Sequence, residues 1–168
     1  VDCKLHIIGD KVEDGDIVVL VVTVDSAAPK GRLIMPQQQV IRDLLDHQAV
    51  AVVTQVPELG SVLERLKGQV KLVITDSQAF KTVDKIVPKE IKLTSFSMLL
   101  AYQKGNFRQL LDGAAAIDKL SADSKVLVLE GCTHNTSHED IGKVKIPALI
   151  KNYLGGETPA VSYTHLTL

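Results

Sequence analysis

The sequence predicts an α/β fold built on a parallel sheet with flanking helices. Three apolar runs, Asp16–Val24, Ala49–Thr54 and Val70–Thr75, are rich in β-branched residues and have the length of strands. Segments with helical spacing of apolar residues separate them. Short apolar strands that alternate with helices are typical of parallel sheets with right-handed crossovers. The first part of the chain therefore indicates a β-α-β-α-β series.

Each element of this series has its own signal. Asp16–Val24 is apolar without alternation, as expected for a strand covered on both faces. Pro36 opens a helix over residues 37–47, because proline is favoured in the first helical turn. One face of that helix carries Val40, Ile41, Leu44 and Leu45. A second helix is expected over Pro57–Leu66, and after the third strand Asp76 or Ser77 can cap another helix.

The second half of the chain predicts an incomplete second α/β unit. After a break at Pro88–Lys92, Thr94 and Ser95 can cap a helix that ends at Gly105. A further strand is expected at Lys125–Leu129 and a helix at Ile146–Tyr153. A helix that starts after Asn106 should bury a face made of Phe107, Leu110, Leu111, Ala114 and Ile117. We place a domain boundary near residue 93, with an α/β domain over 1–93 and the second unit over 94–160.

Composition restricts the class of protein. Hydrophobic residues make up 45% and charged residues 23% of the 168 residues, typical of a globular chain. The net charge of −1 argues against nucleic-acid and membrane-surface partners. The longest apolar run, Ile17–Val24, is too short to cross a bilayer. With two cysteines there is no disulfide framework, so a reducing cytoplasm is the expected compartment.

Cys132 and His134 are the candidate metal ligands. They follow the strand Lys125–Leu129, where a thiolate and an imidazole leave the same short stretch of backbone. Thiolate suits iron–sulfur clusters or zinc, and histidine can replace cysteine on such centres. Ligand sites in parallel α/β sheets lie beyond the carboxyl ends of strands. Two ligands do not close a four-ligand site, so others must come from elsewhere in the chain, from a partner or from residues outside this sequence.

Two other interpretations of this pair remain open. Cys132 can be a small buried residue and His134 a hydrogen-bonded loop residue, since this spacing occurs often by chance. Alternatively, Cys132 is a nucleophile with His134 as its base, although no oxyanion hole or third orienting group is evident.

The loop over 25–36 carries Lys30, Gly31 and Arg32 between a strand and a helix, where they could bind an anion. A turn that leaves its charges solvated explains the same residues. No Gly-x-x-x-x-Gly-Lys-Ser/Thr motif occurs in the 168 residues, so nucleoside triphosphate binding has no support within them. His6 and His47 are isolated in the sequence, and we assign them no role.

Several long blocks of the chain resemble a known family, the maturation GTPases of iron-only (FeFe) hydrogenase. The resemblance extends from about Ile8 to Gly155. The blocks that carry it are Gly9–Asp10, Gly15–Val21, Ala28–Gln39, Ile41–Leu45, Val73–Gln78, Leu93–Ser97, Glu130–His134 and Glu139–Pro147.

The resemblance implies a GTPase domain, a dimerisation domain and a cluster-binding domain, of which residues 1–93 match the second and residues 94–160 the start of the third. It implies a scaffold that receives an iron–sulfur-based precursor assembled with two radical-SAM maturation enzymes. It also implies an iron–sulfur cluster, of the 4Fe-4S type, in the parent protein. The scaffold would deliver the precursor to apo FeFe-hydrogenase and would act as a homodimer or higher homo-oligomer. In the family a Cys-x-His element and a later Cys-x-x-Cys pair hold the cluster, and Cys132 and His134 match the first element.

The chain departs from the family pattern in two places. It contains no Cys-x-x-Cys, so stable cluster binding by these residues alone is not expected. Residues 161–168 do not resemble the family and are expected to be a non-native tail. The competing functions are a small α/β thiol enzyme that uses Cys132 and His134, and a structural dimeriser in which this pair is inert.

Overall fold

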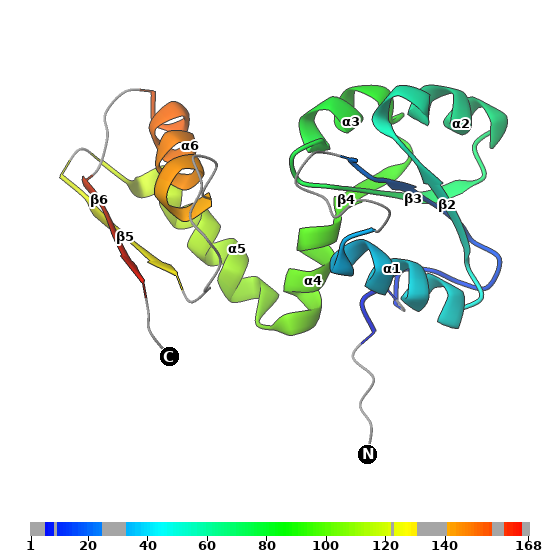
Figure 1. Ribbon diagram of the computed structural model, residues 1–168, viewed down its shortest axis with the longest axis horizontal. Coiled ribbons are helices and arrows are strands. Elements are labelled where there is room, and N and C mark those ends of the chain that lie inside the picture. Colours follow the sequence, from blue (N-terminus) through cyan, green and yellow to red (C-terminus); the bar gives the residue numbers. More distant parts are fainter. Residues whose placement is uncertain are drawn as a thin grey trace, which may run out of the picture. The chain divides into compact units, whose positions relative to one another are not determined.

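β1 (Ile17–Val21) and β3 (Val70–Thr75) lie at the centre of a four-stranded sheet in the computed structural model (Figure 1). β2 (Val50–Thr54) and β4 (Lys92–Ser95) form its edges, in the order β2-β1-β3-β4. Every strand pairing is parallel, which confirms the expected α/β class. The central position of β1 and β3 explains why their sequences are apolar without alternation.

Helices cover both faces of this sheet (Figure 1). α1 (Met35–Asp46) and α4 (Phe96–Lys104) contribute to the core on one face. α2 (Leu59–Arg65), which follows a 3₁₀ turn at Val56–Glu58, and α3 (Phe80–Ile86) cover the other face. Strands that run in parallel need such crossovers, and the helices bury their apolar sides against the sheet.

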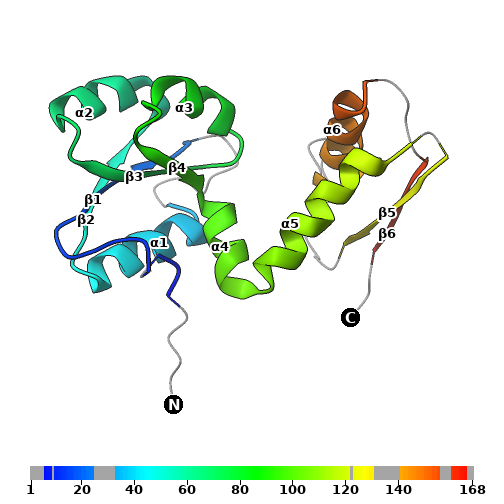
Figure 2. The same ribbon diagram turned by 180° about the vertical axis from the view of Figure 1, so that it is seen from behind.

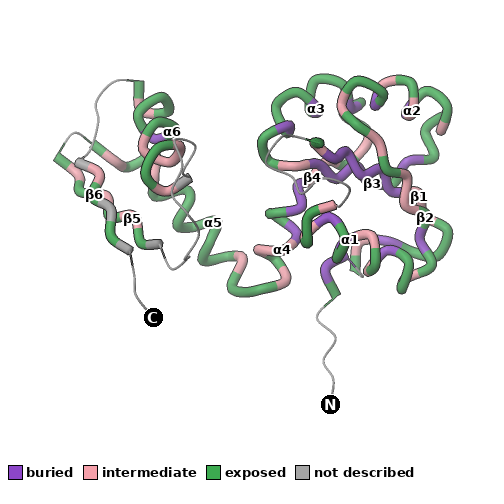
Figure 3. Tube along the Cα trace, viewed as in Figure 1, coloured by how far each residue is buried: buried purple, intermediate pink, exposed green. Residues whose placement is uncertain are grey.

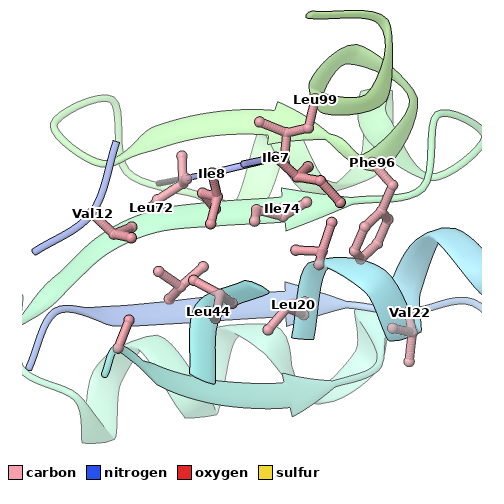
Figure 4. Close-up of a cluster of buried hydrophobic side chains, with 13 residues drawn as sticks. Ile7, Ile8, Val12, Leu20, Val22, Leu44, Leu72, Ile74, Phe96 and Leu99 are labelled. Carbon is pink, nitrogen blue, oxygen red and sulfur yellow. The ribbon is translucent and has the colours of Figure 1, made fainter. Parts of the chain in front are cut away.

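Figure 4 shows the core on the α1 side, where side chains from the strands meet those from both helices. Ile8, Leu20, Leu44 and Ile74 are all fully buried there. Aliphatic side chains of this kind contribute about 1.5–3 kcal/mol each when fully buried. The core also fixes the segment before β1, because Ile7 and Ile8 belong to it.

The structure describes residues 6–8, 10–24, 33–121, 123–130, 141–155 and 160–165. These form two compact units, Val1–Asn106 and Phe107–Leu168. The division comes later than the boundary that we place near residue 93. It does so because Phe96 and Leu99 of α4 are buried in the core of the first unit.

In the first unit one strand was missed in the sequence and one helix cap was assigned wrongly. β4 was not predicted, because a four-residue strand that begins with a lysine and leads directly into a helix has little pattern of its own. Neither Asp76 nor Ser77 caps α3, whose N-cap is Ala79 without a side-chain bond. By contrast, Ser95 caps α4 as expected, since its hydroxyl accepts a hydrogen bond from the backbone N–H of Met98 at 3.2 Å.

The second unit contains a two-stranded parallel sheet, β5 (Lys125–Glu130) and β6 (Ala160–His165), side by side in Figures 1 and 2. All of β6 except Ala160 falls in residues 161–168, which are expected to be a non-native tail, and this expectation stays a prediction. The remaining elements of the unit are α5 (Phe107–Ala115), a 3₁₀ turn at Ala116–Lys119, a π-helical turn at Ile141–Lys145 and α6 (Ile146–Tyr153).

Burial differs sharply between the two units (Figure 3). Within the described part of the second unit, Ile150 is the one buried hydrophobic residue. The face of α5 that was expected to be buried is not buried in the single chain, and Leu110 is 53% exposed. The predicted apolar face of α5 is therefore present, but the described residues of a single chain do not cover it.

None of the described helices is long and apolar enough to span a bilayer.

Candidate functional site

Cys132 and His134 lie outside the described residues, within the segment 131–140. The structure describes the strand before them: β5 ends at Glu130, in register with His165 of β6. Since the pair is parallel, residues 131–140 continue from the carboxyl end of a strand, the end at which parallel sheets bind ligands. The structure confirms the strand that precedes Cys132 and His134, and their assignment as ligands stays a prediction.

The thiols of this chain do not by themselves fit a resident iron–sulfur cluster. A cubane cluster takes four protein ligands, usually thiolates. The 168 residues contain two cysteines, Cys3 and Cys132, and no Cys-x-x-Cys. Cys132 and His134 can supply part of a ligand set, and the remainder needs residues beyond those in this sequence or on a partner.

A second group of polar residues lies at the carboxyl ends of β1 and β3, around Asp76. Thr23 donates to Asp76 Oδ2 twice, from its backbone N–H at 2.9 Å and from its hydroxyl at 2.7 Å. The buried amide of Gln37, at the start of α1, donates to the same carboxylate at 3.2 and 3.3 Å. The Gln37 side-chain oxygen accepts from the backbone N–H of Ile34 at 3.2 Å. Asp76 is therefore hydrogen-bonded to one residue before and one residue after the segment 25–32, which lies outside the described residues.

This arrangement favours a structural role for Asp76 over a catalytic one. Its carboxylate accepts hydrogen bonds from Thr23 and Gln37, which hold it between β1 and α1. The predicted anion-binding residues Lys30, Gly31 and Arg32 lie in the segment 25–32, between Thr23 and Gln37 in the sequence. Their role stays a prediction.

A cavity of about 660 Å³ opens on the first unit beside β3 and β4. Its lining includes Lys11, Lys71 and Lys92, together with Asp10 and Glu13. Several of these charges are paired: Lys11 contacts Asp10, and Lys71 lies 3.4 Å from Asp16. The backbone N–H of Glu13 and the Lys71 ammonium lower the pKa of Asp16 below its usual value. Paired charges of this kind give the cavity no strong preference for an anion.

The structure also brings together three residues that the sequence leaves apart. His6, Asp43 and His47 each place one possible metal-ligand atom within 4.8 Å of the others. The spacing of Asp43 and His47 puts them on one face of a helix end, which is the one signal the sequence contains. His6 is too distant in sequence for any pattern to link it to them.

The comparisons with known proteins follow this division into two units. Residues 7–105 match the model of the hydrogen maturase F dimerization domain. Residues 108–166 match that of the hydrogen maturase F tetramerization domain. The chain belongs to the hydrogen maturase F family. The predicted resemblance is thereby confirmed, and both matched domains of this maturase are named for self-association, which indicates a homo-oligomer.

Other comparisons add little to this assignment. No curated protein matches the maturase chain. Among solved structures, the fatty acid AMP ligase from Legionella pneumophila is similar over 95% of this chain with 13% sequence identity and a TM-score of 0.43. The maturase chain spans 33% of that ligase chain, and so weak a similarity supports no functional argument.

Proposed function

We propose that this chain is the oligomeric part of a carrier for hydrogenase maturation, which holds an iron–sulfur-based precursor as cargo and passes it on. The observation that carries the proposal is the match of two self-association domains of hydrogen maturase F over nearly the whole chain. The proposed suppliers of the cargo are radical-SAM maturation enzymes, and the proposed recipient is apo FeFe-hydrogenase. The cytoplasm is the proposed compartment.

Cys132 and His134 are the proposed contribution of this chain to cargo binding. Thiolate and imidazole are both ligands of iron–sulfur centres. A position directly after a strand suits a carrier, because the cargo must be accessible to both donor and recipient. An incomplete protein ligand set also leaves coordination positions through which a donor or recipient can exchange ligands. Any GTP-dependent step would need residues outside this sequence, which contains no P-loop.

Exposed apolar side chains in the second unit support self-association. Leu110 and Leu111 of α5 are 53% and 46% exposed, and Leu127 of β5 is 58% exposed. A unit with one buried hydrophobic residue among those described gains little stability from burial on its own. We therefore infer that a second copy of the chain covers these faces.

The edge strand β2 is the proposed self-association surface of the first unit. Among the described strands it pairs only with β1, and its Val50 and Val53 are 47% and 46% exposed. An apolar edge strand favours pairing with another strand, and natural proteins usually protect such edges. The opposite edge, β4, is short and begins with Lys92, so it is the better protected of the two.

The decisive experiment is anaerobic reconstitution of a longer form of the chain that includes a downstream Cys-x-x-Cys. We expect this form to take up iron and sulfide and to develop the charge-transfer absorbance of a cluster. Cys132→Ala should lose most of the iron and the absorbance, and His134→Ala should change the spectrum or weaken retention. Cys3→Ala is the matched control and should retain the cluster.

Two outcomes would contradict the proposal. A longer form that stays colourless, or a Cys132→Ala variant with unchanged iron content, would remove the cargo site. Rapid alkylation of Cys132 at neutral pH without iron uptake would instead favour the thiol enzyme, because a reactive catalytic thiol has a lowered pKa.

A further inference from the structure

Asp43 lies between two histidines at the surface of the first unit. Its Oδ1 is 3.6 Å from Nδ1 of His6 and 3.8 Å from Nδ1 of His47. Both distances exceed that of a hydrogen bond, so the lone pairs of Oδ1 are not used by these ring nitrogens. The two imidazole rings approach edge to face, with centroids 4.6 Å apart. A carboxylate oxygen and two imidazoles thus converge on one small region.

Hydrogen bonds outside the cluster hold the ligand atoms in place. Asp43 Oδ2 accepts from the backbone N–H groups of Ile7 at 2.9 Å and Ile8 at 2.8 Å, which leaves Oδ1 facing the rings. The side chains of Ile7 and Ile8 are buried, so the segment that presents His6 is fixed to the core. This pattern resembles the outer shell of metal sites, in which the ligating carboxylates are themselves hydrogen-bonded.

His47 is oriented in the same way. Its Nδ1 lies 2.7 Å from the backbone carbonyl oxygen of Asp43, a contact in which the ring N–H donates. With the proton on Nδ1, the lone pair is on Nε2, where it can bind a cation. Ligating histidines usually donate their second ring N–H to a carbonyl or carboxylate, and this bond fixes the tautomer.

The geometry points to a divalent metal site of the zinc type formed by His6, Asp43 and His47. Two imidazoles and one carboxylate are a donor set found in zinc sites, and water can occupy the remaining position. Ligand bonds of about 2.1 Å imply ligand atoms about 3.4 Å apart in a tetrahedral site. One donor atom from each side chain lies within 4.8 Å of the others, so the rings must rotate to reach this geometry, and the half-exposed His6 can do so.

The surrounding charges permit a cation at this position. Arg42 is the one base among the described residues that line the adjoining cavity, and its Nε is 2.9 Å from Asp46 Oδ1, which pairs its charge. A cavity of about 380 Å³, lined in part by Asp43 and Asp46, opens beside the site and gives solvent and ions access. These three residues belong to the first unit, whereas Cys132 and His134 belong to the sequence of the second.

Zinc titration of the full chain by calorimetry tests this inference, with the purification tag removed and the two cysteines replaced by alanine. We expect one equivalent of zinc to bind, and His6→Ala to weaken the affinity by more than about 100-fold, the upper limit for losing an outer-shell partner. His138→Ala is the control and should leave the affinity unchanged. Zinc should also raise the melting temperature of the parent protein but not of His6→Ala.

Either of two results would overturn the inference: a parent protein that takes up no zinc, or a His6→Ala variant that binds zinc as tightly as the parent. Circular dichroism of His6→Ala establishes that the variant is folded. His47→Ala gives a second, independent loss of one ligand. Because the cysteines are absent throughout, these results leave the proposed cargo function untouched.

Discussion

Two neighbouring residues at the carboxyl end of β3 differ in how their polar atoms are satisfied. Asp76 accepts hydrogen bonds from Thr23 and Gln37, and so connects β1, α1 and β3. Thr75 is fully buried, and none of the described residues bonds to its hydroxyl. A buried hydroxyl without a partner costs about 1–3 kcal/mol, so Thr75 reduces the stability of the sheet while Asp76 increases it.

Replacement of Thr75 by valine should therefore stabilise the protein. Thr75→Val keeps the branched shape and removes the unpaired hydroxyl, so we expect the free energy of unfolding to rise by about 1 kcal/mol. Urea denaturation measures this change. Ser95→Ala is the opposite control, because it removes the cap of α4 and should cost about 1 kcal/mol. A loss of stability in Thr75→Val would mean that the hydroxyl has a partner among residues that the structure does not describe.

At the scale of elements, the stretch from α2 to β3 contains two glycines with opposite roles. Gly60 lies inside the helix, where a methyl group would meet nothing within 4 Å. Gly68, in the turn that follows, has a φ of +76°, a conformation that other residues adopt only with strain. Lys67, the residue before it, also has a positive φ, of 47°, so two consecutive residues of this turn are in the left-handed region.

Alanine at these two positions should shift stability in opposite directions. We expect Gly60→Ala to raise the free energy of unfolding by about 0.5–1 kcal/mol, because glycine is unfavourable within helices. Gly68→Ala should lower it by about 1 kcal/mol through backbone strain. Thermal unfolding followed by circular dichroism compares the two variants with the parent. If both variants moved the melting temperature in the same direction, the assigned backbone conformation would be wrong at one of the positions.

The elements that the sequence predicts are those with local signals. β1 and β3 follow from uninterrupted apolar runs, and the start of α4 follows from the hydroxyl of Ser95. β4 has no such signal, since it is defined by pairing with β3 rather than by its own four residues. The burial of the α5 face was wrong for the single chain because burial depends on what covers a helix, which periodicity does not report.

The sites show the same dependence on distance along the chain. Asp76 was interpreted as a local cap, but its partners Thr23 and Gln37 lie 53 and 39 residues away. His6 and Asp43 likewise meet only through the fold, because Ile7 and Ile8 fix the N-terminal segment against α1. Cys132 and His134 could be proposed from sequence because both ligands fall within one short segment, and that proposal awaits the reconstitution experiment.

At the scale of the whole molecule, the two units differ in how they are stabilised. The first unit has a core on each face of its sheet. The second has one buried hydrophobic residue among those described, and Leu110, Leu127 and Leu149 are each more than half exposed. Its stability should therefore depend on association, as expected for a unit that matches a tetramerization domain.

Charged substitutions in the two units should consequently disrupt different oligomers. Leu110→Lys places a charge on the exposed apolar face of α5, and we expect the tetramer to dissociate into dimers, because about 1.5–3 kcal/mol of apolar burial is lost for each copy. Val53→Lys on the β2 edge should instead prevent dimerisation through the first unit.

Lys119→Glu, at an exposed polar position of the second unit, is the control and should leave the mass unchanged. Size-exclusion chromatography with light scattering measures the mass of each variant. A Leu110→Lys protein that keeps the mass of the parent would show that the α5 face lies outside the interface, and the second unit would then need another source of stability.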